Sequence, residues 1–526
     1  MKKINWLNLV ISIFISISFN LKSIIKKGLD YFVYDFHINT IFILKTIILS
    51  IIIYFILYLL FKGLDKIKLK DTKIVINKKI KLLIFILILI PTLVYLIVYY
   101  PGVYLNDTSF IIHYPISMSN IHPLFYGLVM SIIFFSLNIV FTPSVSIFIM
   151  SIIQVLISSL IITTFIIWFN EKAKSKLLLI LLVLYYVFTP IISNYNMALN
   201  KDTPYTLMIM LFFILIYEFI EKKGKVILEK KYYTKLLLVS IVIIYLRSNG
   251  IYIIIPTLII LFIIYGLKKH IIRYTSIIVL ILIASFIQVI VLKELGVTYL
   301  KREKYSVPIQ QICYLVKYHP DRLNKKDYEL LSKIIPNTKE EIDNNYDEYR
   351  VDEIKYSVHF NNNNFNKNEK KFVGMWFNRL PSNIESYTKS YFLNTYHLWA
   401  VNKLDKKQSV FDEASIYLVN KKDRIYNKTI LPNGIQNIFE EYYKLFNTYL
   451  NPAGCFILIL IVNAYALYRK RKEVVLLSLP LLITWLVLMI SSPLSSALRY
   501  MALYIYLLPV LILYTLKITR KDVENE

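Results

Sequence analysis

The chain has 526 residues, of which 57% are hydrophobic and 18% charged, and its mean hydropathy is +0.55. This apolar share is too high for an ordinary soluble domain. The net charge of +27 would favour nucleic-acid binding in a soluble protein, but here most Lys and Arg residues lie in short loops between apolar runs, as in the cytoplasmic loops of membrane proteins. The composition therefore predicts a multi-pass membrane protein in contact with the lipid bilayer, with no nucleic-acid partner.

Apolar runs of about the 20 residues that a helix needs to cross a bilayer recur along the chain. The first run follows two lysines, which favours a cytoplasmic N-terminus, and no small-residue cleavage site follows it. We therefore read it as a retained span, with a cleaved signal peptide as the alternative. The twelve predicted spans are 4–20, 39–61, 82–100, 144–169, 177–193, 204–221, 235–248, 250–267, 272–292, 453–468, 473–491 and 496–516.

The run 123–138 decides the topology of the chain that follows it. It is apolar but short, and no basic residue flanks it, so it either crosses the membrane or lies at its outer surface. If it crosses, the basic loops 171–176 and 221–235 fall outside. If it lies at the surface, 27 Lys and Arg residues counted from Lys62 fall inside, and only three lie in short outside loops. The positive-inside rule therefore predicts a juxtamembrane helix at 123–138 and cytoplasmic termini.

Residues 296–450 interrupt the apolar pattern with a polar, tyrosine-rich segment that lies outside by parity. Its amphipathic stretches predict a mostly helical extracytoplasmic domain. The expected fold is an all-α polytopic membrane protein of the cell membrane. Its four predicted parts are N-terminal spans with a basic cytoplasmic loop (1–80), a transmembrane core with an external loop at 101–122 (81–295), the extracytoplasmic domain (296–450), and C-terminal spans with a cytoplasmic tail (451–526).

The three basic residues in the short outside loops are Lys201, Arg247 and Arg499. Each belongs to a polar cluster at the end of an apolar run, where a charge against the positive-inside trend indicates a functional site. The first external loop has no Lys or Arg and contains Asp107, and Asp202 directly follows Lys201. Two carboxylates and three cations suit a phosphate-bearing substrate, because the cations can hold phosphate oxygens and a carboxylate can act as a general base.

Each of these residues also has a simpler explanation, which the sequence leaves open. Asp107 fits a turn within a loop. Asp202 fits the N-cap of a helix that opens at Thr203-Pro204. Arg247 and Arg499 fit side chains that extend to phospholipid headgroups.

His113 and His122 lie nine residues apart, which matches no recognised metal-ligand spacing, so we assign no metal site. His122-Pro123 instead fits the start of the juxtamembrane helix. The sequence has no G-x-S-x-G, P-loop or H-E-x-x-H motif, which argues against the common serine hydrolases, P-loop ATPases and zinc proteases. Two cysteines are too few for a disulfide framework.

In order and spacing, these features resemble the GT-C class of integral-membrane glycosyltransferases, which use polyprenyl-phosphate-linked sugars as donors. Asp107, in the pattern P-G-x-x-x-x-D-[ST], resembles the essential acidic residue of their first external loop. Lys201-Asp202 is similar to the acidic position of a later short loop, and His122-Pro123 to the signature that opens a juxtamembrane helix. Several GT-C families have a paired acidic motif where this chain has one Asp, which leaves a divalent metal ion open as a cofactor.

More closely, residues 80–516 resemble an uncharacterised family of Gram-positive multispanning membrane proteins related to the GT-C class. The motifs that carry this resemblance are Tyr100-Pro101-Gly102, Asp107-Thr108, His122-Pro123, Lys201-Asp202-Thr203-Pro204, Arg247-Ser248-Asn249-Gly250, Pro308-Ile309-Gln310-Gln311, Tyr346 to Lys355 with Asp352, and Arg499-Tyr500.

The resemblance implies a GT-C-like transmembrane bundle that transfers a sugar from a polyprenyl-phosphate carrier to a cell-envelope acceptor on the outer face. Asp107 is then the expected general base, and Asp202 the second catalytic residue, which orients Lys201 or the acceptor. The residues expected to bind the donor phosphate are Lys201, Arg247 and Arg499. Further substrate-binding candidates are His113, His122, Asn249, Gln310, Gln311, Asp352 and Lys355.

Two other functions stay open on the sequence. A non-enzymatic lipid or polysaccharide transporter needs a hydrophilic path across the bilayer, whereas the apolar runs carry few charges near their centres. A membrane scaffold protein predicts that the outer charges are scattered, whereas an enzyme predicts that they surround one cavity.

Overall fold

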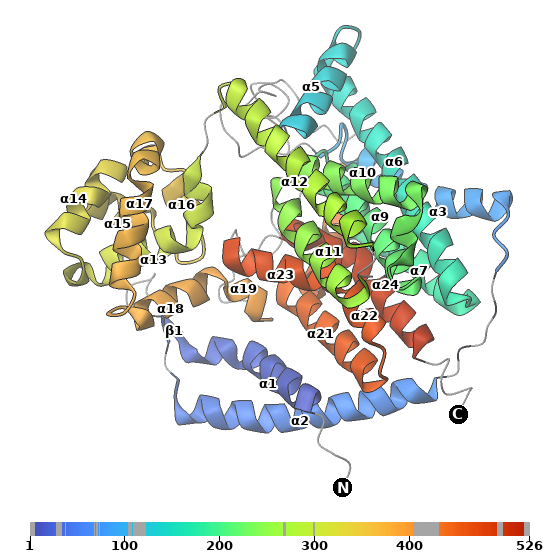
Figure 1. Cartoon of the computed structure of the whole chain (residues 1–526), viewed down its shortest axis with the longest axis horizontal. Coiled ribbons are helices and arrows are strands. Elements are labelled where there is room, and N and C mark those ends of the chain that lie inside the picture. Colours follow the sequence, from blue (N-terminus) through green and yellow to red (C-terminus); the bar gives the residue numbers. More distant parts are fainter. Residues whose placement is uncertain are drawn as a thin grey trace. The chain divides into compact units, whose positions relative to one another are not determined.

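The structure is a computed structural model, and it describes residues 6–27, 34–36, 38–67, 69, 72, 74–103, 108, 123–266, 270–297, 300–402, 431–491 and 498–519. Within these residues the chain is almost entirely helical (Figure 1), as predicted, apart from an antiparallel pair of three-residue strands. The chain divides into two compact units. Unit 1 comprises residues 1–54, 298–410 and 485–497, and unit 2 comprises 55–297, 411–484 and 498–526.

The units differ from the four parts predicted from the sequence, because packing joins segments that are far apart in the chain. Unit 1 contains the strands β1 (Ile25–Lys27) and β2 (Tyr34–Phe36) and the helices α1 (Trp6–Asn20), η1 (Leu21–Ile24), η5 (Lys301–Tyr305), α13 (Ser306–Tyr318), η6 (Pro320–Arg322), α14 (Lys325–Ile334), α15 (Thr338–Asn345), α16 (Asp352–Lys355), α17 (Asn362–Arg379), α18 (Ile384–Asn394) and α19 (Tyr396–Trp399). The helices α2 (Thr40–Lys66) and α23 (Leu479–Ser491) each contribute residues to both units.

Unit 2 contains the helices that form the predicted transmembrane core and the C-terminal spans. They are α3 (Lys78–Val98), α5 (Leu124–Asn138), α6 (Pro143–Ala173), α7 (Lys176–Phe188), α8 (Pro190–Met197), α9 (Asp202–Glu221), η2 (Lys225–Leu228), α10 (Lys230–Leu246), η3 (Ser248–Gly250), α11 (Ile251–Tyr265), α12 (Ile271–Glu294), α20 (Asn433–Tyr449), α21 (Pro452–Tyr468), α22 (Lys472–Leu477), η8 (Leu498–Met501) and α24 (Ala502–Ile518).

Side-chain caps and prolines explain where several of these helices begin. Asn77 Oδ1 accepts a hydrogen bond from the Ile80 N–H at 2.9 Å and starts α3. Pro143 is the first residue of α6, where its fixed φ suits a helix and its missing N–H costs nothing. Pro452 plays the same part in α21, which Asn451 caps. These signals are local, so helix starts of this kind can be read from the sequence.

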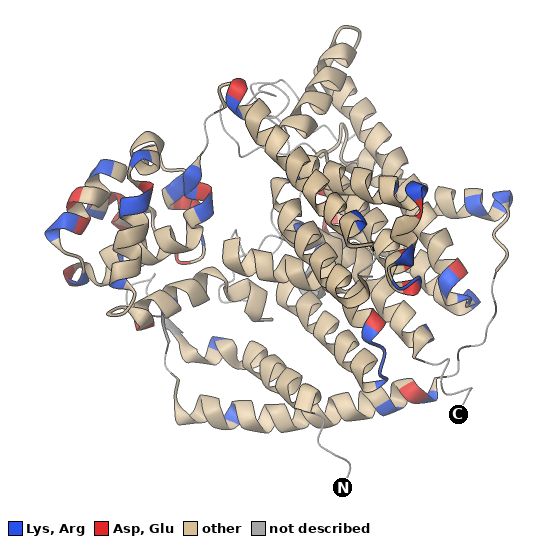
Figure 2. Cartoon of the chain, viewed as in Figure 1, with Lys and Arg blue, Asp and Glu red and all other residues tan. Residues whose placement is uncertain are grey.

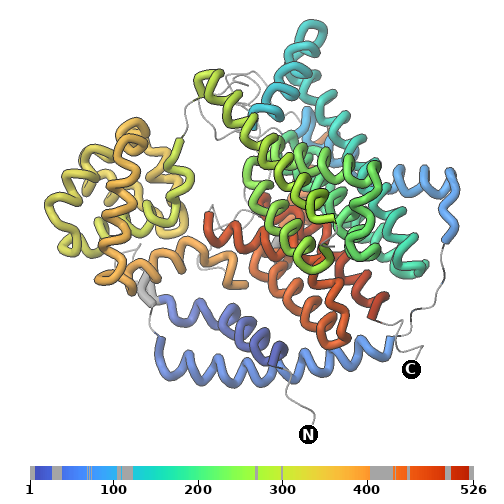
Figure 3. Tube along the Cα trace, in the orientation of Figure 1, coloured from blue at the N-terminus to red at the C-terminus, as the bar shows by residue number. Residues whose placement is uncertain are grey.

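The helices of unit 2 run between two ends, which we name the Asp202 end and the Lys172 end. Helix α9 begins at Asp202 and ends at Glu221, whose carboxylate pairs with Lys172 Nζ in the last turn of α6 at 2.7 Å. Helix α10 packs against both α9 and α12 (Figure 3). Charged residues lie mainly near the helix ends, and the middles of the long helices of unit 2 contain almost none (Figure 2).

The segment that contains α5 connects the end of α3 to the start of α6, and these two points lie at the same end of unit 2. Before α3, the Asn170 side chain at the end of α6 donates a hydrogen bond to the Ile74 carbonyl at 2.8 Å. After α3, the Tyr100 ring lies 5.1 Å from that of Phe148, close to the start of α6. Helices α3 and α6 are therefore antiparallel, and the chain between them makes no net crossing. This arrangement agrees with the predicted juxtamembrane helix at 123–138.

In the part of the chain that the structure describes, eight helices are long and apolar enough to cross a membrane, or nine if the bent pair of α7 and α8 counts as one span. The predicted spans 235–248, 453–468 and 473–491 correspond to α10, α21 and the α22–α23 pair, which are short or broken. The chain is a multi-pass membrane protein by these helices. The predicted number of twelve spans stays a prediction.

Helices α13, α14, α15 and α17 of unit 1 share a buried apolar core that includes Ile312 and Phe365. A capping box starts α14, in which the Asn324 and Asp327 side chains each accept the other's backbone N–H at 3.0 Å. The prediction that residues 296–450 are mostly helical is thus confirmed for the described parts, 300–402 and 431–450.

Candidate functional site

A broken helix brings a buried polar segment to the Asp202 end of unit 2. Helices α7 and α8 meet at an angle of 58°, because Pro190 cannot continue the hydrogen-bonding pattern of α7. Every residue of α8 is buried, although several are polar. Gln154 Nε2 donates hydrogen bonds to the backbone carbonyls of Asn196 and Ala198, at 2.9 and 2.7 Å, and the Tyr506 hydroxyl donates one to Asn196 Oδ1 at 2.9 Å. These contacts hold the chain that leads into α9.

The start of α9 fixes the backbone around Asp202. Asn200 Oδ1 accepts hydrogen bonds from the N–H groups of Asp202 and Thr203, both at 2.8 Å, and Thr203 Oγ1 donates to the Tyr195 carbonyl at 2.7 Å. The alternative that Asp202 serves as the N-cap is therefore wrong: Asp202 is the first residue of α9, and Asn200 supplies the capping oxygen. The Asp202 carboxylate is free for other contacts and lies where the helix dipole favours a negative charge.

Asp202 forms a buried ion pair with Arg247. Arg247 Nη1 contacts Asp202 Oδ1, and the two side chains are only 15% and 4% exposed, respectively. Arg247 follows the last residue of α10, where the backbone turns from helix to an extended conformation. Its guanidinium carbon lies over the rings of Tyr205 and Tyr500, at 5.7 and 5.0 Å. An ion pair and two aromatic faces thus hold the guanidinium in place.

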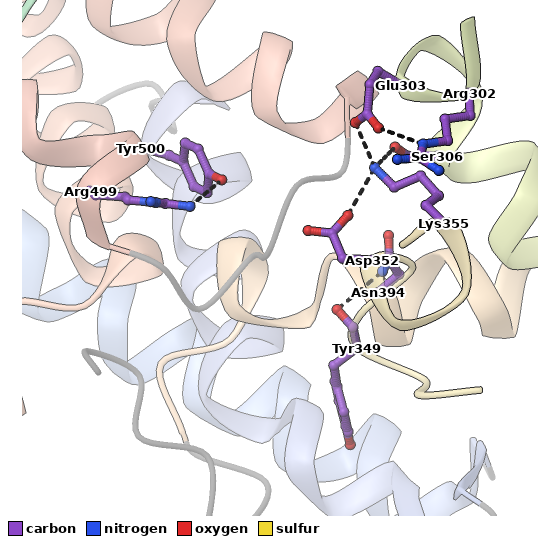
Figure 4. A network of polar contacts seen from close by, with 9 residues as sticks. All are labelled: Arg302, Glu303, Ser306, Tyr349, Asp352, Lys355, Asn394, Arg499 and Tyr500. Carbon is purple, nitrogen blue, oxygen red and sulfur yellow. Dashed lines mark hydrogen bonds and ion pairs between the residues drawn. The ribbon is translucent and has the colours of Figure 1, made fainter. Parts of the chain in front are cut away.

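Tyr500 joins the second guanidinium to this cluster. Arg499 Nη2 donates a hydrogen bond to the Tyr500 hydroxyl at 3.1 Å (Figure 4), and the guanidinium carbon lies 5.0 Å from the centre of the same ring. The Tyr500 ring therefore contacts both Arg247 and Arg499. Tyr195, in α8, is close enough to interact electrostatically with both Asp202 and Arg499. We call Asp202, Arg247, Arg499 and Tyr500 the arginine cluster.

The arginine cluster combines residues from three segments that are far apart in the sequence: the start of α9, the end of α10 and η8. It holds two cations and one carboxylate, so it is net positive. Lys201 precedes Asp202 and is half-buried, and Asn249 is exposed in η3. The sequence predicted that Asp202, Arg247 and Arg499 belong to one site, and their contacts bring them together.

Two described residues, Val103 and Thr108, connect the segment 101–122 to the same region. The Leu199 N–H donates a hydrogen bond to the Val103 carbonyl at 3.0 Å, and Thr108 Oγ1 donates one to the Leu199 carbonyl. Gly102, just before Val103, has φ +120° and would place a Cβ 2.5 Å from Ser151 Oγ, so this turn requires glycine. The chain on both sides of residues 104–107 is thus fixed at Leu199, close to Asp202.

Three predicted site residues, Asp107, His113 and His122, lie outside the described residues. Their roles stay predictions. Among the residues that the structure describes, no group of three or more His, Cys, Asp and Glu side chains could hold a metal ion.

Asp352 and Lys355, predicted from the sequence, belong to a charge network in unit 1 (Figure 4). Lys355 Nζ lies 2.8 Å from Asp352 Oδ1, 2.9 Å from Glu303 Oε2 and 3.2 Å from Ser306 Oγ, and its side chain is almost fully buried. Burial disfavours the ammonium, but the carboxylates of Asp352 and Glu303 outweigh it and raise the pKa of Lys355. Arg302 lies next to Glu303 at 3.4 Å. The network is balanced in charge, so it stabilises the start of α13 and α16.

Gln310 and Gln311 are buried in α13 and hold unit 1 together. Gln310 Nε2 donates to the backbone carbonyls of Asp347 and Glu348, at 2.7 and 3.1 Å. Gln311 Nε2 donates to the Tyr387 carbonyl at 3.0 Å, and its Oε1 accepts from Trp376 Nε1 at 2.7 Å. These contacts give both glutamines a structural role, and their binding of substrate stays a prediction.

A family model described as a family of unknown function, DUF6020, matches residues 110–526, about four fifths of the chain. The chain belongs to this family. No curated protein and no solved structure matches the chain. The part that matches DUF6020 contains the whole arginine cluster and begins just after Asp107.

Sequence reasoning did not assign a role to Asn200, Tyr205 or Tyr500. Two features of the sequence could have identified the tyrosines: Tyr500 lies beside Arg499 in a motif that the sequence analysis described, and Tyr205 lies one helical turn after Asp202. An aromatic residue one turn from a buried carboxylate, or next to an arginine, is a candidate for stacking against a guanidinium.

Proposed function

We propose that the chain is a GT-C-type membrane glycosyltransferase that moves a sugar from a polyprenyl-phosphate carrier to a cell-envelope acceptor on the outer face of the cell membrane. The observation that carries the proposal is the arginine cluster, in which two guanidiniums lie against a single tyrosine ring and one of them pairs with a buried carboxylate. A scaffold protein does not require these charges to lie together. A transporter of a charged headgroup needs charged groups along its path, whereas the middles of the long helices of unit 2 carry almost none (Figure 2).

In the proposed reaction, the acceptor hydroxyl attacks the anomeric carbon of the donor sugar and displaces polyprenyl phosphate. The bond from that carbon to the phosphate oxygen breaks as the new glycosidic bond forms, with inversion at carbon. Asp107 takes the hydroxyl proton as general base. Arg247 and Arg499, aided by Lys201, hold the leaving phosphate by charge-assisted hydrogen bonds, which strengthen as its negative charge grows. Because guanidiniums can neutralise this charge, the mechanism requires no metal ion.

The burial of Asp202 and its pairing with Arg247 suit a positioning role. The contact with the Arg247 guanidinium occupies the Asp202 carboxylate, and the burial of both side chains keeps this pair in one arrangement. Asp202 fixes the position of Arg247, and the Leu199 contacts of Val103 and Thr108 bring the ends of the Asp107 segment near that position. We therefore propose Asp107 as the general base and Asp202 as the residue that positions Arg247.

The proposed topology has twelve spans, both termini in the cytoplasm, and the Asp202 end of unit 2 at the outer surface. The remaining candidates Asn249, His113 and His122 are proposed to contact the acceptor or the donor sugar, whereas Asp352 and Lys355 keep the structural role that their contacts in unit 1 give them.

The proposal is tested by comparing the envelope glycans of a deletion strain that carries wild type, Asp107→Asn, Arg499→Gln or Lys230→Gln. Lys230 is an exposed lysine at the opposite end of α10 from Arg247 and serves as the matched control. We expect a glycan modification that is lost on deletion, returns with wild type and Lys230→Gln, and stays absent with the other two variants. The mass of the modification identifies the sugar. If Asp107→Asn restores it fully, with the protein expressed equally, the proposed mechanism is wrong.

A further inference from the structure

A second charged site lies at the Lys172 end of unit 2. A cavity of about 440 Å³ is lined there by residues that include Lys172, Lys223, Arg471 and Lys517 together with Glu221 and Glu473. Its volume falls in the usual range for small-molecule sites. Helix α9 has 20 residues, so at about 1.5 Å per residue its two ends lie roughly 30 Å apart. This cavity is therefore separate from the arginine cluster.

The cavity is net positive even after its internal ion pairs are counted. Lys172 Nζ lies 2.7 Å from Glu221 Oε2, and Arg471 Nη1 lies 3.4 Å from Glu473 Oε1. Each carboxylate is thus already matched by one cation. Lys517 adds a further positive charge to the wall, and Lys223 another.

Lys517 is the least expected of these residues. It lies in the last turn of α24 and is only 4% exposed, whereas a lysine at a helix end normally reaches water. Attraction to the negative end of the helix dipole accounts for one cation at a helix terminus. It does not account for cations from the ends of α6 and α24 and from the start of α22 converging on one cavity.

Tyrosines complete the wall with aromatic faces and hydroxyl groups. Lys172 Nζ lies 4.9 Å from the centre of the Tyr217 ring, and the Tyr217 hydroxyl donates to Glu221 Oε1 at 3.2 Å. The Tyr514 ring packs edge-on against Tyr217 with ring centres 5.4 Å apart. Lys172 and Arg471 are thus each held by neighbouring side chains in the wall of the cavity.

We propose that this cavity binds a phosphate-bearing anion, with Arg471 and Lys517 as donors to the phosphate oxygens and Lys223 as an additional cation at its rim. The Lys and Arg distribution predicts that this end faces the cytoplasm, where the anion comes either from a phospholipid headgroup of the inner leaflet or from a soluble phosphate. The site does not depend on the proposed sugar transfer, which takes place at the other end of unit 2.

The test uses the purified full-length chain in detergent and in nanodiscs. Thermal unfolding is measured with increasing inorganic pyrophosphate, against sodium chloride of the same ionic strength, because salt alone screens charges. A second arm compares nanodiscs of phosphatidylglycerol with nanodiscs of phosphatidylcholine. The variants are Lys517→Gln, Arg471→Gln and Lys223→Gln, with Lys470→Asn as control. Lys470 is exposed, does not line the cavity and has φ 59°, a conformation that Asn tolerates.

We expect saturable stabilisation by pyrophosphate, by phosphatidylglycerol or by both, and at least a tenfold higher half-saturating concentration for Lys517→Gln and Arg471→Gln, with Lys470→Asn unchanged. Stabilisation by pyrophosphate identifies a soluble ligand, and stabilisation by phosphatidylglycerol alone identifies a lipid. If Lys517→Gln and Arg471→Gln fold poorly, Lys223→Gln, at an exposed position, still has to weaken binding. Absence of stabilisation in both arms, or equal stabilisation of wild type and every folded variant, would overturn the proposal.

Discussion

Replacing Arg247 by glutamine should destabilise unit 2 by leaving a buried carboxylate without its partner. The Asp202 side chain is 4% exposed and that of Arg247 15%, so water screens neither charge well. Breaking a buried pair by removing one partner typically costs about 3 to 5 kcal/mol. The start of α9 offsets part of this cost, since a helix N-terminus stabilises a carboxylate by up to about 1 kcal/mol. We therefore expect a loss of about 3 kcal/mol for Arg247→Gln.

The two single variants should differ, because the partners are buried to different extents. Asp202→Asn leaves Arg247, which is more exposed and keeps its contacts with the Tyr205 and Tyr500 rings, so its cost should be lower, about 1 to 2 kcal/mol. The double variant leaves no unpaired buried charge. It should recover about 2 kcal/mol relative to the sum of the single variants.

Thermal unfolding of the purified chain in detergent measures this cycle. A loss of about 3 kcal/mol should lower the apparent midpoint by roughly 5 °C, because a large unit shifts less per kcal/mol than a small domain. Lys230→Gln is the control and should leave the midpoint unchanged. If both single variants unfold at the wild-type temperature, or if the double variant is destabilised by the full sum, Asp202 and Arg247 do not form the buried pair.

Three further predictions follow from local contacts. Tyr500→Phe keeps the ring that both guanidiniums face and should lower the stability of the fold by about 1 kcal/mol through the lost hydroxyl contact. Tyr500→Leu also removes the ring, so it should lower stability further and reduce glycan modification more strongly, as measured by thermal unfolding and glycan mass spectrometry. Gly102→Ala should destabilise the chain by about 1 to 3 kcal/mol, because its φ is +120° and the new Cβ meets Ser151 Oγ, while Gly434→Ala, with nothing within 4 Å, should not; equal midpoints would contradict this. The pKa of Lys355 is raised above its ordinary value of 10.5, so the stability that Lys355 contributes is complete below pH 10.5 and is lost as the pH rises through the folded-state pKa. The difference in unfolding midpoint between wild type and Lys355→Met should therefore be constant from pH 7 to 9 and shrink above pH 10.5.

Local sequence signals predicted most of the helices that the structure describes. Hydropathy located most spans, and the asymmetry of Lys and Arg singled out 123–138 as a helix without a net crossing, in agreement with the antiparallel packing of α3 and α6. The same asymmetry singled out Arg247 and Arg499, because the predicted topology places them in short outside loops, where cations are rare.

Packing decided what the sequence left open. The apolar run 177–193 did not predict the 58° bend at Pro190, because hydropathy gives the length of an apolar segment but not the direction of its helix axis. The capping of α9 by Asn200, and not by Asp202, depends on which of these two polar side chains accepts hydrogen bonds from the first N–H groups of the helix. The cavity at the Lys172 end was hidden for a similar reason: each of its lysines fits the positive-inside rule alone, and only the tertiary fold brings them together.

The most direct measurement titrates the purified chain with polyprenyl phosphate, the carrier that the proposed reaction releases, and measures sugar transfer on the same preparations by glycan mass spectrometry. We predict saturable binding that Arg499→Gln weakens at least tenfold and that Asp107→Asn and Lys230→Gln leave intact, together with loss of transfer in both Arg499→Gln and Asp107→Asn. Binding that is absent from wild type, or equally strong in folded Arg499→Gln, would contradict the assignment of the arginine cluster to the carrier phosphate.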